Sequence, residues 1–254
     1  MHASDPNDQL AAGMRTNEAC LSCHESYGES LEEHTHHAAD SPGSLCYNCH
    51  MPHTTYALLK GIRSHRIEPP DLSVSARTGR PHACNLCHLD KTLQWTSDQL
   101  SRWYGPDAAR GDLNEDQRNV AASILWLLKG NAAQRVIAAW HFGWEPAQMA
   151  SGNDWQAPFL AQLLDDPYAA IRFVAHRALV SLPGYVEFAY DFVAPQADRR
   201  AAQRAALAQW SPDRSTFSQD RIAPLLINAD GRLHQPRVSE LIEQRDQRPI
   251  YITE

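Results

Sequence analysis

The stretch Cys46-Tyr47-Asn48-Cys49-His50 decides how this chain is organised, because its pattern occurs twice more. The other copies are Cys20-Leu21-Ser22-Cys23-His24 and Cys84-Asn85-Leu86-Cys87-His88. In chain order the three copies are called the first, second and third motif, and together they contain all six cysteines. Two cysteines that flank two residues and precede a histidine are typical of covalent c-type haem attachment.

The spacing suits this chemistry because a short turn presents both sulfur atoms along one porphyrin edge, where each adds to a vinyl group. The histidine that follows then lies below the iron as its proximal ligand. The sequence therefore predicts three c-type haems. The predicted attachment residues are Cys20, Cys23, Cys46, Cys49, Cys84 and Cys87, and the predicted proximal ligands are His24, His50 and His88.

Two other uses of such cysteine pairs fit less well. A four-ligand zinc site would use two pairs and strand the third, and it gives no reason for a histidine after every pair. A thioredoxin-like redox pair would lie in a strand-helix-strand setting, which the surrounding Pro- and His-rich sequence does not show.

Histidine is the expected second axial ligand, because methionine is scarce and Met51 directly follows His50, so it cannot reach across the same ring. The densest cluster is Glu33-His34-Thr35-His36-His37-Ala38. A helix over residues 29–39 would place His34 and His37 on one face and His36 elsewhere, so two neighbouring irons could draw ligands from one segment. The alternative is that members of this cluster are solvated on a polar helix.

His65 is a further distal candidate, in a segment that Pro69 and Pro70 should hold extended. Arg63 and Arg66 beside it are expected to pair with haem propionates. Other histidines are expected to have structural roles; they are His53, His82, His141 and His176.

Three stretches stand in a characteristic order: the second motif continued by Met51-Pro52-His53-Thr54-Thr55-Tyr56, then Arg63-Ser64-His65, then the third motif continued by Leu89-Asp90-Lys91. Over about residues 17 to 105 the chain thereby resembles bacterial multihaem c-type cytochromes of the doubled-CxxCH kind. The resemblance implies bis-histidine, low-potential electron carriers. It also implies that His65 is one distal ligand and that one of His34, His36 or His37 is another.

The same chemistry predicts a location outside the cytoplasm, periplasmic or extracellular. The opening residues have neither a basic start nor an apolar stretch, so we expect that a signal peptide has been removed. Many relatives carry further haem motifs upstream, so we expect the haem set here to be incomplete or to be completed by a partner.

Composition excludes several partners. The 254 residues carry a net charge of −7, and neither half is basic: residues 1–95 have 7 Lys+Arg against 11 Asp+Glu, and residues 96–254 have 16 against 19. A nucleic-acid partner is therefore not expected. No apolar run approaches the ~20 residues of a membrane span.

Acidic pairs such as Asp165-Asp166 are interpreted as solvated helix ends.

Beyond residue 95 cysteine disappears, and apolar residues recur at helical spacing on both sides of Gly130-Asn131, which predicts a helical hairpin. The pattern returns 36 residues later, around Leu164 and Ala175, and resembles a HEAT repeat. No strand pattern is apparent. We therefore expect a mainly α fold: a loop-rich triheme module over residues 1–95, then an α-helical HEAT-like (α-solenoid) domain over residues 96–254.

The function favoured by the sequence is electron transfer between redox partners, such as other cytochromes or a membrane-associated complex, without catalytic residues of its own. Two alternatives remain open. One is a haem oxidoreductase with one open iron, acting on a small oxyanion near Arg63, Arg66 or Arg77. The other is a haem-bearing docking subunit in which the helical region either binds a partner or simply covers the haem module.

Overall fold

Short helices form the half of the chain that contains the three motifs. The structure is a computed structural model that describes residues 14, 16–57, 59–211 and 218–249. The elements of this half are α1 (Glu18–Leu21), α2 (Glu25–Glu29), α3 (Leu31–Thr35), η1 (Pro42–Ser44), α4 (Cys46–His50), β1 (Thr55–Ala57), β2 (Lys60–Ile62), α5 (Leu72–Thr78) and α6 (Ala83–Cys87).

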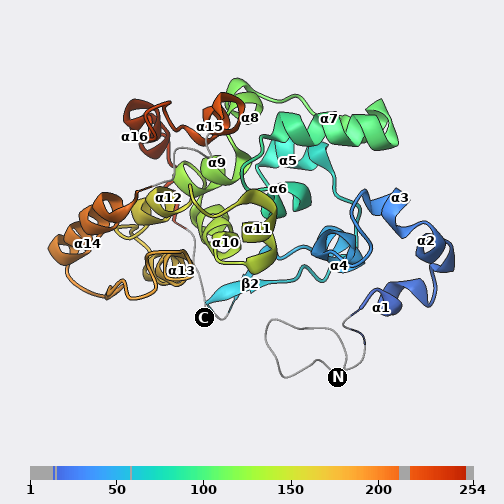
Figure 1. The fold of residues 1–254 in the computed structure, drawn as a ribbon, viewed down its shortest axis with the longest axis horizontal. Coiled ribbons are helices and arrows are strands. Elements are labelled where there is room, and N and C mark those ends of the chain that lie inside the picture. Colours follow the sequence, from blue (N-terminus) through green and yellow to red (C-terminus); the bar gives the residue numbers. More distant parts are fainter. Residues whose placement is uncertain (1–13, 15, 58, 212–217, 250–254) are drawn as a thin grey trace.

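The remaining half contains the longest helices, and the described part of the chain is mainly helical, as the sequence predicts. Its elements are α7 (Leu93–Tyr104), η2 (Pro106–Ala109), α8 (Glu115–Asn119), α9 (Ala122–Leu128), α10 (Ala132–Phe142), α11 (Glu145–Ser151), α12 (Ala157–Gln162), α13 (Ala169–Leu179), α14 (Gln196–Gln209), α15 (Gln219–Ile222), η4 (Ala223–Leu225) and α16 (Gln235–Glu243). Figure 1 places α1–α3 at one end and α14 at the other. Within the described residues, no helix has the length and apolar character needed to span a bilayer.

Polar side chains set where several helices begin. Asn131 accepts a hydrogen bond from the Gln134 backbone N–H, and the Gln134 side chain accepts one from the Asn131 N–H. This reciprocal capping satisfies two otherwise unpaired donors and starts α10 directly after Gly130. The break predicted between the two helices of the hairpin therefore separates α9 from α10. Asp71 caps α5 by accepting from the backbone N–H groups of Ser73 and Val74.

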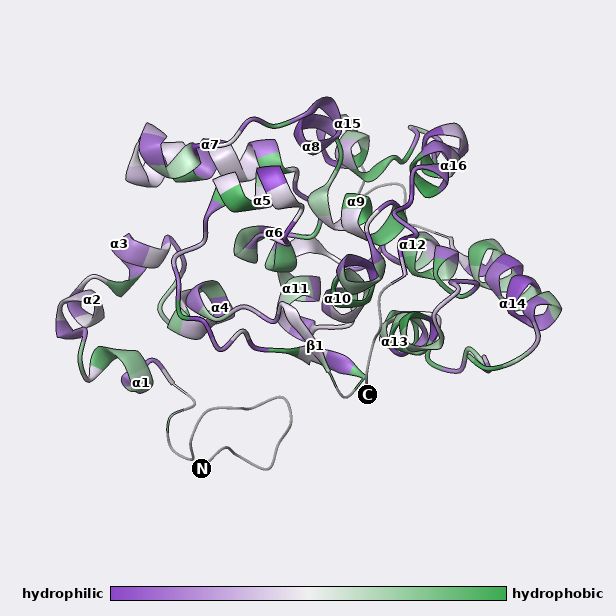
Figure 2. Ribbon diagram, turned by 180° about the vertical axis from the view of Figure 1, so that it is seen from behind, coloured by the Kyte–Doolittle hydropathy of each residue, from purple (hydrophilic) through white to green (hydrophobic). Residues whose placement is uncertain are grey.

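Two helix pairs stack to form the core. Every residue of α9 is buried, and α10 packs against both α9 and α13. The second pair, α12 and α13, packs in turn against the first, with α12 against α9. Trp155, Phe142 and Phe159 fill the space between them and are fully buried. The outer helix α8 buries none of its residues and is hydrophilic in Figure 2.

The hydrophobic core runs without a break across residue 95. Leu72, Leu86 and Leu89 belong to the same buried cluster as the residues of α9 and α10. The Ser123 hydroxyl donates to the Leu89 carbonyl at 2.5 Å, which ties α9 to the segment after the third motif. The helical half thus packs directly on the half that contains the motifs, and the two predicted regions share one core.

Asp166 corrects the expectation that Asp165-Asp166 is a solvated helix end. Its carboxylate is fully buried and lies 2.8 Å from Nε of Arg135, which is 1% exposed. Arg245, beyond α16, reaches the same carboxylate at 3.2 Å. The sequence predicted a charged residue at this position but not that its side chain would be buried. Asp166 lies in the turn between α12 and α13, and its carboxylate joins that turn to α10 and to the segment beyond α16.

A small antiparallel hairpin also departs from the sequence analysis, which found no strand pattern. β1 pairs with β2 in the register Thr55 with Ile62, Tyr56 with Gly61 and Ala57 with Lys60. Strands of three residues are too short to show an alternating pattern over several residues. The hairpin packs against α10.

Candidate haem centre

Each motif forms a single helical turn that brings its two cysteines to one side. The second motif coincides with α4, and the cysteines of the third motif lie on α6. In the first motif Cys20 lies on α1, and the His24 backbone N–H closes the turn by donating to the Cys20 carbonyl at 3.0 Å. Residues three apart share a helix face. All six thiols are unpaired with one another as disulfides, so they are available for thioether bonds.

The cysteines of different motifs lie close together. Burial, and after it the neighbouring charge of Cys49, raise the pKa of the Cys84 and Cys87 thiols to about 12. Burial and then Cys20, which also hydrogen bonds to it, raise the pKa of Cys46. Thiols of the first and second motifs, and of the second and third, are therefore close enough to interact electrostatically.

His34 faces the proximal histidine of the second motif. Their ring centroids are 6.3 Å apart and their planes differ by only 6°. Two imidazoles that bind one metal in line through bonds of about 2 Å have centroids roughly 6 Å apart. His50 Nδ1 lies 3.2 Å from the Glu68 carbonyl oxygen. A carbonyl bonded to one ring nitrogen fixes the ring and leaves the other nitrogen for a metal.

His37 faces the proximal histidine of the third motif in the same manner. The His37 and His88 centroids are 6.0 Å apart, with an angle of 27° between the rings. His37 Nδ1 lies 2.6 Å from the Thr35 carbonyl oxygen, so its ring is oriented as His50 is. Trp95 lies against His88 with a centroid separation of 5.0 Å. The structure thus pairs two histidines of one segment with two different motifs.

The end of α3 explains how one segment serves both motifs. The helix ends at Thr35, and His36 adopts a left-handed conformation with φ of 55°. This corrects the expected helix over residues 29–39: His34 lies on the helix while His37 lies beyond it, on a redirected backbone. His36 itself stacks on Trp103, with centroids 4.3 Å apart and an angle of 15°. A turn of this kind leaves no trace in helical periodicity.

His24 and His65 differ from these pairs. His24 is exposed at the start of α2, and the Tyr27 ring lies 6.2 Å from it. His65 is exposed in the loop that follows β2. The two pairs above use His34 and His37, so the distal role predicted for His65 belongs to neither pair and stays a prediction.

Arg63 has a role that the sequence analysis missed. Arg63 is 8% exposed, and the propionate pairing expected for it stays a prediction. Its guanidinium donates to the carbonyl oxygens of Tyr47 and Met51, at 2.9 and 3.2 Å, and to Asn48 Oδ1 at 2.7 Å. Arg63 therefore holds the backbone of the second motif. Arg63 and Tyr47 are sixteen residues apart in the sequence, so no local sequence pattern indicates this contact.

Two other histidines, His53 and His141, are buried and have lowered pKa values. Burial lowers the pKa of His53 to about 2 and that of His141 to about 4, and the charge of Arg63 contributes to both. His53 packs against Trp140, with ring centroids 4.7 Å apart. His176 differs in being half-buried, with Nε2 2.9 Å from the Phe188 carbonyl oxygen. These placements agree with structural roles.

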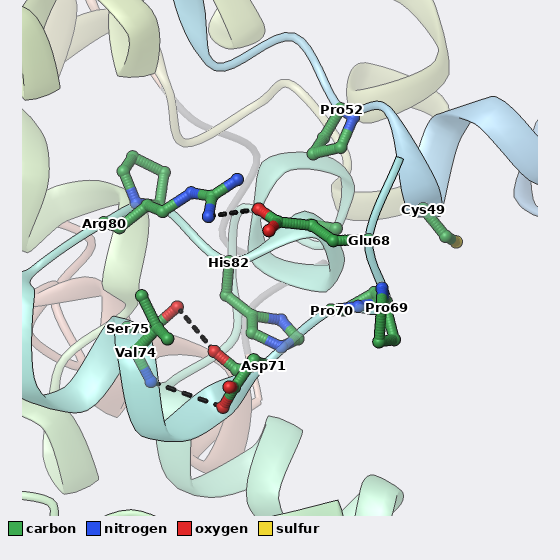
Figure 3. A pocket seen from close by; sticks show the side chains of 12 residues that line it. Cys49, Pro52, Glu68, Pro69, Pro70, Asp71, Val74, Ser75, Arg80 and His82 are labelled. Atoms are coloured by element: carbon green, nitrogen blue, oxygen red, sulfur yellow. Dashed lines mark hydrogen bonds and ion pairs between the residues drawn. The ribbon is translucent and has the colours of Figure 1, made fainter. Parts of the chain in front are cut away.

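His82 caps the third motif and lines an open pocket beside it (Figure 3). Its Nδ1 accepts the Cys84 backbone N–H at 3.3 Å, and burial lowers its pKa to about 4. Its Nε2 has no hydrogen-bond partner within the described residues. The pocket has a volume of about 160 Å³. Cys49 stands at one side and Arg80, which pairs with Glu68, at the other.

The paired imidazoles and neighbouring thiols are donor types that c-type haem uses. Across residues 14, 16–57, 59–211 and 218–249, no group of three or more His, Cys, Asp or Glu side chains is placed to hold a metal, as four-ligand zinc requires. Two paired imidazoles with free thiols beside them suit iron held in a porphyrin and completed by two axial nitrogens. Comparison of the chain with protein-family models, curated proteins and solved structures found no match.

Proposed function

We propose that this chain is a c-type cytochrome that transfers electrons through three covalently bound haems. The observation that carries the proposal is the pairing of His34 with His50 and of His37 with His88, each at the separation that one iron between them needs. Three motifs that use every cysteine support it independently. When bound, haem supplies one-electron chemistry at iron.

The chain's own residues define each site. His50 and His34 would hold the iron of the second motif, and the Glu68 carbonyl fixes the His50 ring through Nδ1. His88 and His37 do the same at the third motif, with the Thr35 carbonyl behind His37. Two imidazoles leave no position for substrate, which favours electron transfer over catalysis at these two irons.

The closeness of the motifs supports transfer from one haem to the next. Cys49 of the second motif interacts electrostatically with both cysteines of the third, and Cys46 with Cys20 of the first. The attachment cysteines of successive motifs are therefore neighbours. The exposed first motif is the natural point for exchange with a partner, whereas the third lies against the helical half.

We assign the helical half a supporting role, as a HEAT-like α-solenoid whose repeats are the pairs α9–α10 and α12–α13. Equivalent helices of successive pairs pack together, which is how helical repeats bury their apolar faces. The inner face of α10 covers the hairpin and His53 through Trp140. Packing over the haem module accounts for this half more directly than partner docking does.

The proposed location is outside the cytoplasm, where c-type haem is attached, and the proposed partners are redox proteins with a basic or neutral face. Residues 16–59 contain the first two motifs and no Lys or Arg. The six acidic residues of this segment are all exposed; they are Glu18, Glu25, Glu29, Glu32, Glu33 and Asp40. Such a surface attracts opposite charge.

A second candidate function is favoured by the first motif alone. The ring that contacts the exposed His24 is that of Tyr27, and the two histidines His34 and His37 face the other motifs. An iron there with an open position would make the chain a haem oxidoreductase for a small ligand. Carbon monoxide uptake by the reduced wild-type chain distinguishes the two functions. No uptake supports an electron carrier without an open iron, whereas one molecule bound per chain supports an open iron at the first motif.

Axial-ligand variants of the haem-loaded protein test the main proposal. His34→Ala and His37→Ala should each convert one low-spin haem to a high-spin, carbon-monoxide-binding haem, at the second and third motif respectively. His36→Ala is the matched control, because His36 lies in the same segment but stacks on Trp103. The proposal is wrong if His36→Ala opens an iron, or if neither of the other variants does so in protein that carries haem.

A further inference from the structure

Arg63 is a buried cation fixed to the second motif. Besides its three hydrogen bonds to Tyr47, Asn48 and Met51, its guanidinium carbon lies 4.2 Å from the centroid of the Tyr47 ring. Tyr47 and Asn48 are the two residues between the cysteines, and Met51 follows the proximal histidine. One side chain therefore braces the turn on both sides of Cys49 and His50.

The backbone around Arg63 is anchored independently of the motif. It directly follows β2, and the Ser64 N–H donates to the Pro52 carbonyl at 2.9 Å. Gly61 lies flat against α10: a Cβ there would stand 2.9 Å from Trp140 Cδ2. The guanidinium thus projects from a hairpin fixed on the helical core, which makes it a rigid brace rather than a mobile surface group.

The positive charge of Arg63 acts on buried titratable groups around it. The same charge lowers the pKa of His53 and His141, and it counteracts the burial that raises the pKa of Cys87 in the third motif. A charge that acts on several buried groups is only weakly screened by water.

We propose that Arg63 positions the second motif and that its buried charge raises the reduction potential of the haem held there. This inference rests on the proposed function. Ferric haem carries one more positive charge than ferrous haem, so a fixed neighbouring cation disfavours the oxidised form. Nearby charge and burial are established means by which a protein sets such potentials. Arg63 is a positioning residue for the motif, because its guanidinium holds Tyr47, Asn48 and Met51, while its charge would act on the haem through space.

The test is a spectroelectrochemical titration of the haem-loaded full chain, with the second haem identified as the one that His34→Ala makes high-spin. Arg63→Gln should lower its potential by at least about 59 mV, a tenfold change in a one-electron equilibrium. Arg63→Lys keeps the charge but loses the planar fork, so it should lower the melting temperature and leave the potential near the wild-type value. Arg110→Gln is the control, because Arg110 pairs with Asp107 on the exposed surface.

A second variant covers the case in which Arg63→Gln fails to fold. Asn48→Asp nearly preserves shape and the bond to Arg63 while adding a compensating charge, so it should also lower the potential of the second haem. Unchanged potentials in haem-loaded Arg63→Gln or Asn48→Asp overturn the inference, as does an equal fall in Arg63→Lys. A wild-type chain that carries no haem after maturation would instead refute the proposed function.

Discussion

Replacement of Gly43 by alanine should open the iron of the third motif. Gly43 lies in η1, against the ring of His37. An added Cβ would overlap Cγ and Cδ2 of His37 and stand 2.8 Å from Nε2, whereas non-bonded carbon contacts are about 3.5–4.0 Å. The ring must therefore retreat by roughly 1 Å, which is half the length of a metal–nitrogen bond of about 2 Å. Overpacking of this kind also costs about 1–3 kcal/mol of stability.

The assay is carbon monoxide uptake together with low-temperature magnetic resonance of the haem-loaded chain. Gly43→Ala should bind one more carbon monoxide per chain than wild type and show one additional high-spin haem. Gly28→Ala is the matched control, because the Cβ added in α2 would meet Leu21 Cδ1 at an ordinary 3.5 Å. Full haem loading with unchanged ligand uptake and unchanged spin states would refute the assignment of His37.

Two further predictions concern the support around the motifs. Asp166→Asn should lower the free energy of unfolding by about 3–5 kcal/mol, because it leaves the buried cation of Arg135 without its counter-charge. The change is measured as a lower midpoint of urea unfolding. An unchanged midpoint would show that the pair does not stabilise the fold. His53 has a pKa lowered to about 2 against an ordinary value of 6.5, so the unfolded chain binds its proton first and stability should fall as pH drops below about 6.5. His53→Phe should flatten the dependence of melting temperature on pH between 7 and 4, and an equally steep dependence in this variant would exclude His53 as its source.

The parts of the site that could be predicted from sequence are those fixed by local chemistry. Cys-x-x-Cys-His spans one helical turn, and the structure contains this turn in each motif; the assignment of its residues to haem rests on spacing alone and stays a prediction. Helical periodicity likewise predicted the α9–α10 pair, because apolar spacing and the Gly130-Asn131 break are local signals. The three-residue strands of the hairpin lie below the length at which periodicity is informative.

Residue pairing over long distances could not be predicted. The partners of His34 and His37 depend on the left-handed turn at His36, for which glycine or asparagine would have been the usual signal. In the sequence Arg63 stands out only as a neighbour of His65, yet its guanidinium donates to backbone carbonyls sixteen and twelve residues away. Asp166 shows the same limit, since only the tertiary fold brings Arg135 and Arg245 to it.

The central claim is that porphyrin is covalently attached at all three motifs, and intact-protein mass spectrometry tests it most directly. The chain should be produced in a cell compartment with active c-type haem maturation and measured under denaturing conditions, which remove any haem held by ligation alone. The account predicts a mass excess of three haem groups and no thiol that reacts with a cysteine reagent. An apoprotein mass with six reactive thiols, from cells that mature a known c-type cytochrome normally, would contradict it.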